Sequence, residues 1–178
     1  MNITTDRKIT VAQVPSLLLI QEMRNHKDIK PHVLSAIQEA GVNPLITEKE
    51  KLSNTDWHMG ANFDRRYMNY IGSGIREVCD YTEKFFGYGQ TLELQNYWYQ
   101  VYGKDDYHDW HIHPKCMFSN IYYVSLPEGV SKTTFRLRDE EFSIDVKEGD
   151  VLTFPASMMH CSKPNQSYEQ KVVVVFNI

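Results

Sequence analysis

The chain is short of cysteine, of excess charge and of long apolar runs, and each shortage argues against a class of protein. Its three cysteines have no CxxC spacing, which disfavours a disulfide framework or a zinc ribbon and fits the reducing cytoplasm. The formal net charge of −4, without a Lys/Arg run, provides no basic surface for nucleic acid. The apolar stretch 14–20 is too short for a membrane span and lacks the pattern of a signal peptide. We therefore expect a cytoplasmic protein without membrane or nucleic-acid partners, and the sequence leaves a homodimer open.

The first half of the chain, residues 1–90, is predicted to be helical and mixed, within one domain that spans residues 1–178. A helix is expected inside 28–41, where Pro31 suits a first turn and a glycine stands at the end. A second helix is expected inside 64–87, again ending at a glycine, although two further glycines interrupt its middle. The polar segment between the two helices is expected to be a loop.

From residue 91 to residue 178 the pattern changes to short strands rich in aromatic and branched residues, separated by turn-forming segments. The expected strands are 91–102, 120–126, 133–138, 142–146, 150–155 and 171–178. Strands at this spacing, with no helical period between them, predict an antiparallel sandwich or barrel. The last segment is apolar on both faces, so we expect it at the centre of a sheet. The fold class is therefore predicted to be mainly β with N-terminal helices.

Histidine is concentrated in the short segment "HDWHIH" at 108–113, which holds three of the seven histidines in the chain. In an extended segment Asp109, His111 and His113 would share one face, and His108 would lie on the opposite face. Two imidazoles two residues apart can bind one metal ion. Imidazole suits iron, zinc, copper and nickel alike, so the pair predicts a metal site without choosing the metal.

A third imidazole is available much later in the chain. His160 follows a Gly-Asp turn at 149–150, a short strand and Pro155, so that a loop would present it. The alternative is that these histidines are ordinary hydrogen-bonded residues of the surface or core. An HxH pair joined by a distal histidine favours a metal site formed by His111, His113 and His160.

The segments "YGKDDYHDWHIH" (102–113), "VKEGDVLTFPASMMHCSKP" (146–164) and "KVVVVFNI" (171–178) resemble the Fe(II)- and 2-oxoglutarate-dependent oxygenases. Within that family they are most similar to a branch found in bacteria and phages, and "TDWH" at 55–58 also looks like that branch. The resemblance covers about residues 91–178, half of the chain. It implies a double-stranded β-helix, the jelly roll that the cupins also have, preceded by helices.

The family resemblance also implies a set of metal ligands. The iron of these enzymes is held by an HxD/E pair and a distal histidine, which leaves positions open for co-substrate and oxygen. Carried over, His111 is the first ligand, His160 is the distal ligand, and His113 takes the acidic position. A neutral imidazole in place of a carboxylate makes the Fe(II) site one unit more positive. Asp109 is the alternative to His113, because it could supply the missing carboxylate.

A co-substrate pocket follows from the same resemblance, which calls for a cation after the distal histidine to bind the far carboxylate of 2-oxoglutarate. Lys171 is the candidate cation, with Tyr102 and Gln100 as further co-substrate contacts. The alternative for Lys171 is a strand-edge lysine that reaches solvent. Other candidates lie on neighbouring predicted strands: Arg136 and Arg138 as a second carboxylate clamp, and Asn120, Tyr122 and Tyr123 beside them.

The resemblance implies a dioxygenase that uses Fe(II), 2-oxoglutarate and O2 to hydroxylate a C–H bond of a prime substrate, for which the sequence offers no motif. No catalytic residue beyond the metal ligands is expected. One alternative is a cupin-like three-histidine dioxygenase or isomerase that does not use 2-oxoglutarate, and Lys171 argues against it because a cupin has no need of that cation. A second alternative is a non-catalytic jelly-roll binding protein.

Overall fold

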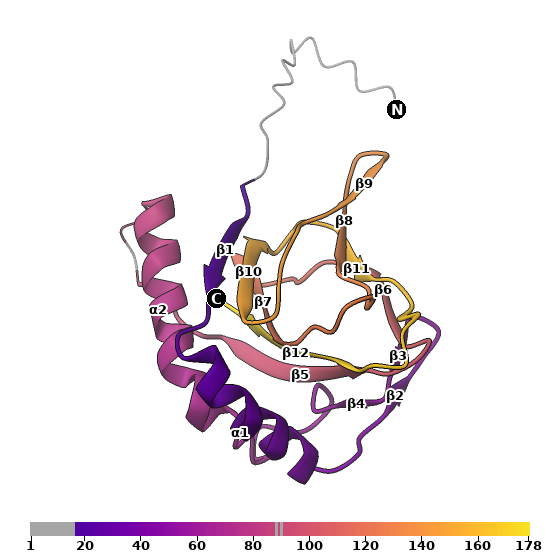
Figure 1. Ribbon diagram of the computed structural model, residues 1–178. Coiled ribbons are helices and arrows are strands. Elements are labelled where there is room, and N and C mark those ends of the chain that lie inside the picture. The colour runs from indigo at the N-terminus through magenta and orange to yellow at the C-terminus, as the bar shows by residue number, and fades with distance from the viewer. Residues whose placement is uncertain (1–16, 88, 90) are drawn as a thin grey trace, which may run out of the picture.

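The computed structural model describes residues 17–87, 89 and 91–178, which form mainly β-strands with two helices (Figure 1). The expectation that the chain has no signal peptide concerns its N-terminal segment, and most of that segment lies outside the described residues. Among the described residues, no helix combines the length and the apolar character needed to cross a membrane.

The two helices are α1 (His26–Glu39) and α2 (Met68–Phe86), and both confirm the sequence prediction. Helix α1 begins before the predicted segment, after Asn25 in the left-handed conformation with φ of 55°. Pro31 therefore lies in the second turn, and its predicted place in the first turn was wrong. Helix α2 ends as expected at Gly87, whose φ of 66° is a conformation that glycine adopts without steric cost.

The strands form two six-stranded sheets in which neighbouring strands are antiparallel. The first sheet has the order β1 (Leu19–Glu22), β10 (Asp150–Pro155), β7 (Phe118–Ser125), β12 (Lys171–Asn177), β5 (Asn96–Tyr102) and β4 (Asn54–Thr55). The second has the order β2 (Leu45–Ile46), β3 (Glu50–Leu52), β6 (Tyr107–His111), β11 (His160–Ser162), β8 (Thr133–Leu137) and β9 (Glu140–Ser143). The predicted fold class, a jelly roll with N-terminal helices, is confirmed.

Two predictions about local structure were wrong. The segment 42–63 was expected to be a loop, but it contains β2, β3 and β4. These strands have only two or three residues, too few to give an alternating pattern. They form by pairing, β3 with β6, β4 with β5 and β2 with β3. The strand predicted at 142–146 begins and ends earlier in the chain, since β9 spans Glu140–Ser143.

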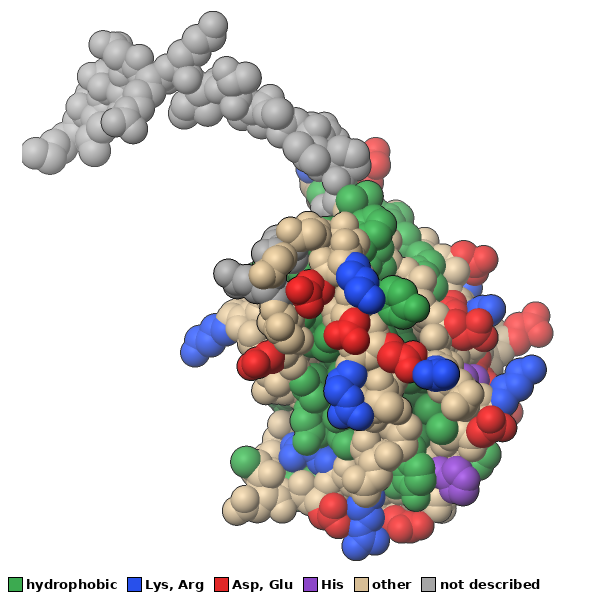
Figure 2. Space-filling view, turned by 90° about the vertical axis from the view of Figure 1, so that its left-hand side faces the viewer, with side chains coloured by type: hydrophobic (Ala, Val, Ile, Leu, Met, Phe, Trp, Pro, Cys, Tyr) green, Lys and Arg blue, Asp and Glu red, His purple; other side chains and the backbone are tan. Residues whose placement is uncertain are grey.

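The helices cover the outer face of the first sheet, and the inner faces of the two sheets pack against each other (Figure 1). Figure 2 shows the helical face, where acidic and basic side chains are interspersed. Strand β12 lies between β7 and β5, as predicted. Its Val172, Val174 and Phe176 join the core beneath the helices. Val173 and Val175 join the core between the sheets, which explains why the segment is apolar on both faces.

The two glycines in the middle of α2 have different surroundings, and this yields a paired prediction. A Cβ at Gly72 would meet no atom within 4 Å, whereas a Cβ at Gly74 would lie 2.2 Å from Sδ of the buried Met23. Gly72→Ala should raise the free energy of unfolding by up to about 1 kcal/mol, since alanine favours a helix. Gly74→Ala should be less stable than Gly72→Ala because Met23 must move within a packed core. Chemical denaturation measures both, and equal stability of the two variants would contradict the packing described here.

Candidate metal centre

The strand that carries the histidines contains a β-bulge. Between β6 and β11, His111 pairs with His160 and His108 pairs with Ser162, so three steps along β6 match two along β11. The extra residue shifts the alternation of side chains along β6. His108 and His111 therefore lie side by side, with stacked rings whose centroids are 3.8 Å apart. The prediction that His108 faces away from His111 was wrong because it assumed a regular strand.

Three imidazoles converge at one point between the sheets. His111 is at the end of β6, His113 follows two residues later, and His160 begins β11. One nitrogen of each ring lies within 4.8 Å of the nitrogens of the other two. The structure thus brings together the three residues that the sequence selected, from two segments almost fifty positions apart.

The other nitrogen of each ring is already occupied by a hydrogen bond. His111 and His160 each donate Nδ1–H to the backbone carbonyl two residues earlier, at 2.7 and 2.9 Å. His113 donates Nδ1–H to Oδ1 of Asn177 at 2.8 Å, and the hydroxyl of Ser119 also lies 2.9 Å from that nitrogen. Each bond leaves the Nε2 lone pair free, which is the arrangement found in histidines that bind metals.

Burial keeps these imidazoles neutral at physiological pH. It lowers the pKa of His111 to about 4 and that of His160 to about 2, and the neighbouring imidazoles add to the effect. Burial likewise lowers the pKa of His113. A neutral imidazole is the form that binds a metal ion, so no proton has to leave these rings first.

Asp109 does not join this group. It lies in the bulged part of β6, its side chain is exposed, and its carboxylate accepts a hydrogen bond from the backbone N–H of Trp110 at 2.7 Å. The structure therefore assembles three imidazoles without the carboxylate that the sequence had left as an alternative.

Lys171 lies at the opposite end of the same cavity, deeply buried with 2% of its surface exposed. Its ammonium donates hydrogen bonds to the hydroxyl of Ser162 and to the carbonyl of Ser131 at 2.9 Å, and it lies 4.1 Å from the ring centre of Tyr102. Among the described residues no carboxylate lies within 4 Å of it. Burial lowers the pKa of Lys171 to about 7. The alternative of a strand-edge lysine that reaches solvent was wrong.

Tyr102 and Gln100 lie between Lys171 and the histidines, on the inward face of β5. Tyr102 donates its hydroxyl proton to Oε1 of Gln100 at 2.8 Å, and Nε2 of Gln100 lies 3.3 Å from Nδ1 of His108. Nε2 of His108 lies 2.7 Å from a carboxylate oxygen of Glu50. Glu50 was not predicted as a site residue, because it lies in the segment expected to be a loop.

Trp98 lines the cavity, and Trp57 lines the adjoining pocket together with Trp98. Trp98 is 4% exposed, its ring lies 5.5 Å from that of His113, and its indole N–H has no hydrogen-bond partner among the described residues. Trp57 packs edge-on against Trp98, with ring centres 4.3 Å apart, and remains half exposed. An indole donor without a partner beside the histidines indicates a ligand or water with an acceptor atom.

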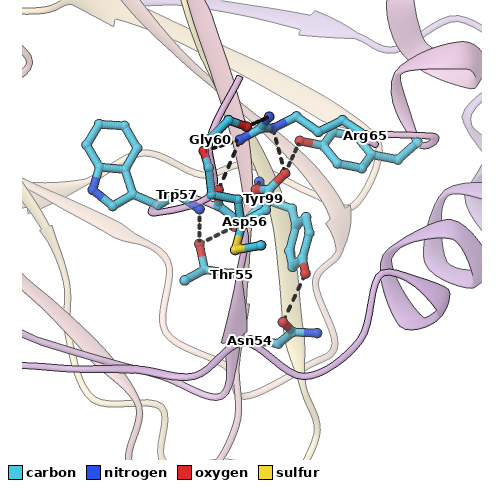
Figure 3. Close-up of polar contacts among 9 residues, drawn as sticks. Asn54, Thr55, Asp56, Trp57, Gly60, Arg65 and Tyr99 are labelled. Carbon is cyan, nitrogen blue, oxygen red and sulfur yellow. Dashed lines mark hydrogen bonds and ion pairs between the residues drawn. The ribbon is translucent and has the colours of Figure 1, made fainter. Parts of the chain in front are cut away.

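Trp57 is held in place by a buried carboxylate next to it, Asp56 (Figure 3). Asp56 accepts hydrogen bonds from the hydroxyl of Tyr67 at 2.9 Å and from the backbone N–H of Tyr99 at 2.8 Å. Nε of Arg65 lies 2.8 Å from the same carboxylate, and the rest of that guanidinium donates to backbone carbonyls of the loop. Asp56 thus ties the loop after β4 to β5, which explains the aspartate of "TDWH" as structural.

The remaining candidates lie outside the cavity. Arg136 is exposed and forms an ion pair with Glu141 at 2.6 Å, and Arg138 is exposed as well. Asn120 accepts a hydrogen bond from Thr153 within the first sheet. Tyr122 faces the helices and Tyr123 faces the core between the sheets, and neither lines the cavity. Of the other histidines, His26 bonds to Tyr122 and Glu148, and His32 and His58 are exposed.

A family model described as "Putative 2OG-Fe(II) oxygenase" matches residues 96–144, from β5 to β9. The comparison with curated proteins gives no match. The predicted resemblance to the Fe(II)/2-oxoglutarate oxygenases is confirmed by the family model and by the solved structures that follow.

Several solved structures of oxygenases share the fold. The viral collagen prolyl hydroxylase of Paramecium bursaria Chlorella virus-1, solved with 2-oxoglutarate, is 14% identical with a TM-score of 0.66, covering 90% of this chain and 94% of its own. The prolyl-4-hydroxylase of Pseudomonas putida is 12% identical with a TM-score of 0.61, covering 91% of each chain. A prolyl hydroxylase of Trichoplax adhaerens, in complex with a peptide of hypoxia inducible factor, is 13% identical with a TM-score of 0.65, covering 90% and 83%. At these identities the likeness establishes the jelly-roll fold.

The buried lysine should make the stability of the ligand-free protein depend on pH. The pKa of Lys171 is about 7 in the folded chain and about 10.4 in an unfolded one, so the unfolded state binds the extra proton between these values. Folding therefore becomes less favourable as pH falls from about 10 to 7, and the loss is complete below pH 7. Lys171→Met should gain stability relative to the natural chain across that window, measured by chemical denaturation. A difference that does not vary with pH would contradict the burial of the ammonium.

Proposed function

We propose that the chain is an Fe(II)- and 2-oxoglutarate-dependent oxygenase that hydroxylates a C–H bond of a prime substrate. In this proposal His111, His113 and His160 hold the metal, while Lys171, Tyr102 and Gln100 receive the co-substrate. The observation that carries it is that one cavity contains both three free Nε2 lone pairs and a buried ammonium, which has no carboxylate partner among the described residues. The free thiols of Cys79, Cys116 and Cys161 are consistent with the cytoplasm as its location.

The donor set fits a first-row divalent metal. Neutral imidazole binds iron well, and three converging ligands leave further positions of the ion free for other groups. Each ring is oriented by the hydrogen bond at its Nδ1, so the site needs little rearrangement to accept an ion. When bound, Fe(II) together with 2-oxoglutarate and O2 supplies the oxidising chemistry.

The far end of the cavity fits a dicarboxylate. An unpaired buried ammonium is costly, and a carboxylate placed against it removes that cost while it raises the lysine pKa again. Tyr102, whose ring lies 4.1 Å from the Lys171 ammonium, can turn its hydroxyl from Gln100 to the same carboxylate. The unpartnered N–H of Trp98 beside His113 provides a donor for an oxygen bound near the metal.

The chain's own contribution is orientation and exclusion of water. Val173 and Val175 of β12 line the cavity together with Lys171 and the histidines, so a ligand held at both ends crosses an apolar surface. The pocket that contains Trp57 and Trp98 reaches His111 and His113, and it is the route by which the prime substrate would approach the metal. A cupin-like enzyme that does not use 2-oxoglutarate has no need of Lys171, and this residue therefore favours the oxygenase.

Metal binding is tested by unfolding experiments with Mn(II) as a redox-stable probe. A ligand present at a hundred times its dissociation constant stabilises the folded state by about 2.7 kcal/mol. His111→Ala and His160→Ala should abolish this stabilisation because each removes one of three ligands. The matched control is His58→Ala, which removes an exposed histidine and should keep it. Stabilisation by Mn(II) that survives both triad substitutions would rule out the proposed metal site.

Co-substrate binding is tested by adding 2-oxoglutarate, or an analogue that cannot react, to the Mn(II)-loaded protein. The natural chain should gain a second increment of stability. Lys171→Met should keep the increment due to Mn(II) and lose the one due to 2-oxoglutarate, since only the ammonium partner of the far carboxylate is removed. Lys163→Met, which alters an exposed lysine paired with Glu141, is the control. Retention of the second increment in Lys171→Met would exclude the assignment of this lysine.

A further inference from the structure

Among the described residues no acidic side chain lines the cavity itself, and Glu50 is the one acidic residue of the adjoining pocket, which shares His108, His111 and His113 with it. Glu50 opens β3, directly opposite His108 in the β3–β6 ladder, and its carboxylate lies 2.7 Å from Nε2 of that histidine. Its side chain is 22% exposed and therefore only partly accessible to solvent. None of the three candidate metal ligands, His111, His113 and His160, is a carboxylate.

The contact with the triad runs through His108. Its ring stacks on that of His111 with centroids 3.8 Å apart and an angle of 12° between the planes. Because an ionised carboxylate only accepts hydrogen bonds, His108 must donate Nε2–H to Glu50 and accept at Nδ1 from the amide of Gln100. The anion at one end therefore fixes both the tautomer of His108 and the orientation of Gln100.

Counting charges indicates why a carboxylate is needed here. A divalent ion held by three neutral imidazoles carries two positive charges, and a protonated Lys171 adds a third. A bound dicarboxylate supplies two negative charges, which leaves one positive charge in a largely buried cavity. Ionised Glu50 supplies the remaining negative charge, and the space between the sheets then holds no net charge. Uncompensated charge away from water is strongly unfavourable.

We propose that Glu50 acts as the carboxylate of this metal site from outside the ligand set, stabilising the bound cation through His108 stacked on His111. The inference rests on the function proposed above, because it requires a cation at the triad. Glu50 does not touch the metal and is a positioning and charge-compensating residue. The contact with His108 holds the Glu50 carboxylate beside the triad. His108 in turn orients the side-chain amide of Gln100.

The test is the affinity for Mn(II), measured by calorimetric titration at 0.15 M salt, in Glu50→Gln, Glu50→Asp and Glu48→Gln. Glu50→Gln keeps the shape and the ability to accept a hydrogen bond but removes the charge. We expect its dissociation constant to rise roughly ten-fold, or about 1.4 kcal/mol. Glu50→Asp keeps the charge and should recover most of the affinity. Glu48→Gln removes a charge from the same β2–β3 turn at an exposed position and should lie within two-fold of the natural chain, because salt screens exposed charges.

A purely structural role for Glu50 is separated from charge compensation by unfolding the metal-free proteins. Glu50→Gln should unfold at nearly the same denaturant concentration as the natural chain, while its Mn(II) affinity falls. Equal Mn(II) affinity in Glu50→Gln and the natural chain would overturn the inference and leave the proposed function intact. An equal loss in Glu50→Asp and Glu50→Gln would also overturn it, since charge would then not be the cause. Failure of the natural chain to bind Mn(II) would instead refute the proposed function.

Discussion

The pairing of His111 with His160 across the β6–β11 ladder is the constraint on which the rest of the site depends. Directly opposed residues of an antiparallel pair have their Cβ atoms about 5 Å apart, so two imidazoles on one face necessarily meet. His113 lies beyond the end of β6, and its backbone N–H donates to the carbonyl of Ala156 at 2.9 Å. That bond fastens the segment after β6 to the loop before β11, and the third imidazole is thereby fixed against the first two.

A second ladder fixes the opposite end of the cavity and its distance from the histidines. In the β5–β12 pair, Lys171 lies opposite Tyr102, and Asn177 lies at the other end of β12. Asn177 accepts the Nδ1–H of His113. One continuous strand therefore carries both the cation that suits a carboxylate and the amide that orients a metal-binding imidazole. Because β12 is paired on both sides, this separation is held by the centre of the sheet.

Much of this arrangement could be predicted from the sequence, and the errors share a physical cause. The helices, the later strands and the triad were found because helical period, branched residues and the HxH spacing are local signals. The bulge in β6 has no such signal, since it depends on how β6 pairs with β11, and His108 was therefore assigned to the wrong face. Glu50 was missed because β3 has three residues and exists only through its partner strand.

The burial of Lys171 could not be predicted from the sequence for a different reason. Its position after the distal histidine came from the family resemblance, and its apolar neighbours alone are equally typical of a lysine at a strand edge. Only the packing of the two sheets shows that the ammonium is enclosed. The buried Asp56 is a similar case, because the role of the aspartate in "TDWH" depends on partners from two other segments of the chain. Arg65 and Tyr67 precede α2, and Tyr99 lies in β5. Figure 3 shows Arg65 and Tyr99 beside Asp56.

The choice of imidazole and lysine over carboxylate and arginine has a consequence for the empty cavity. Three imidazoles that burial keeps neutral, and a lysine whose pKa burial lowers to about 7, place little charge inside the cavity in the absence of ligands, and the carboxylate of Glu50 lies beside it. An arginine could not lose its proton in this way, and a carboxylate among the ligands would be a buried anion without a cation. The cation and the dicarboxylate then bring their opposite charges into the cavity together. The opposite charges of the two ligands compensate each other, which lowers the free-energy cost of burying charge in the folded chain.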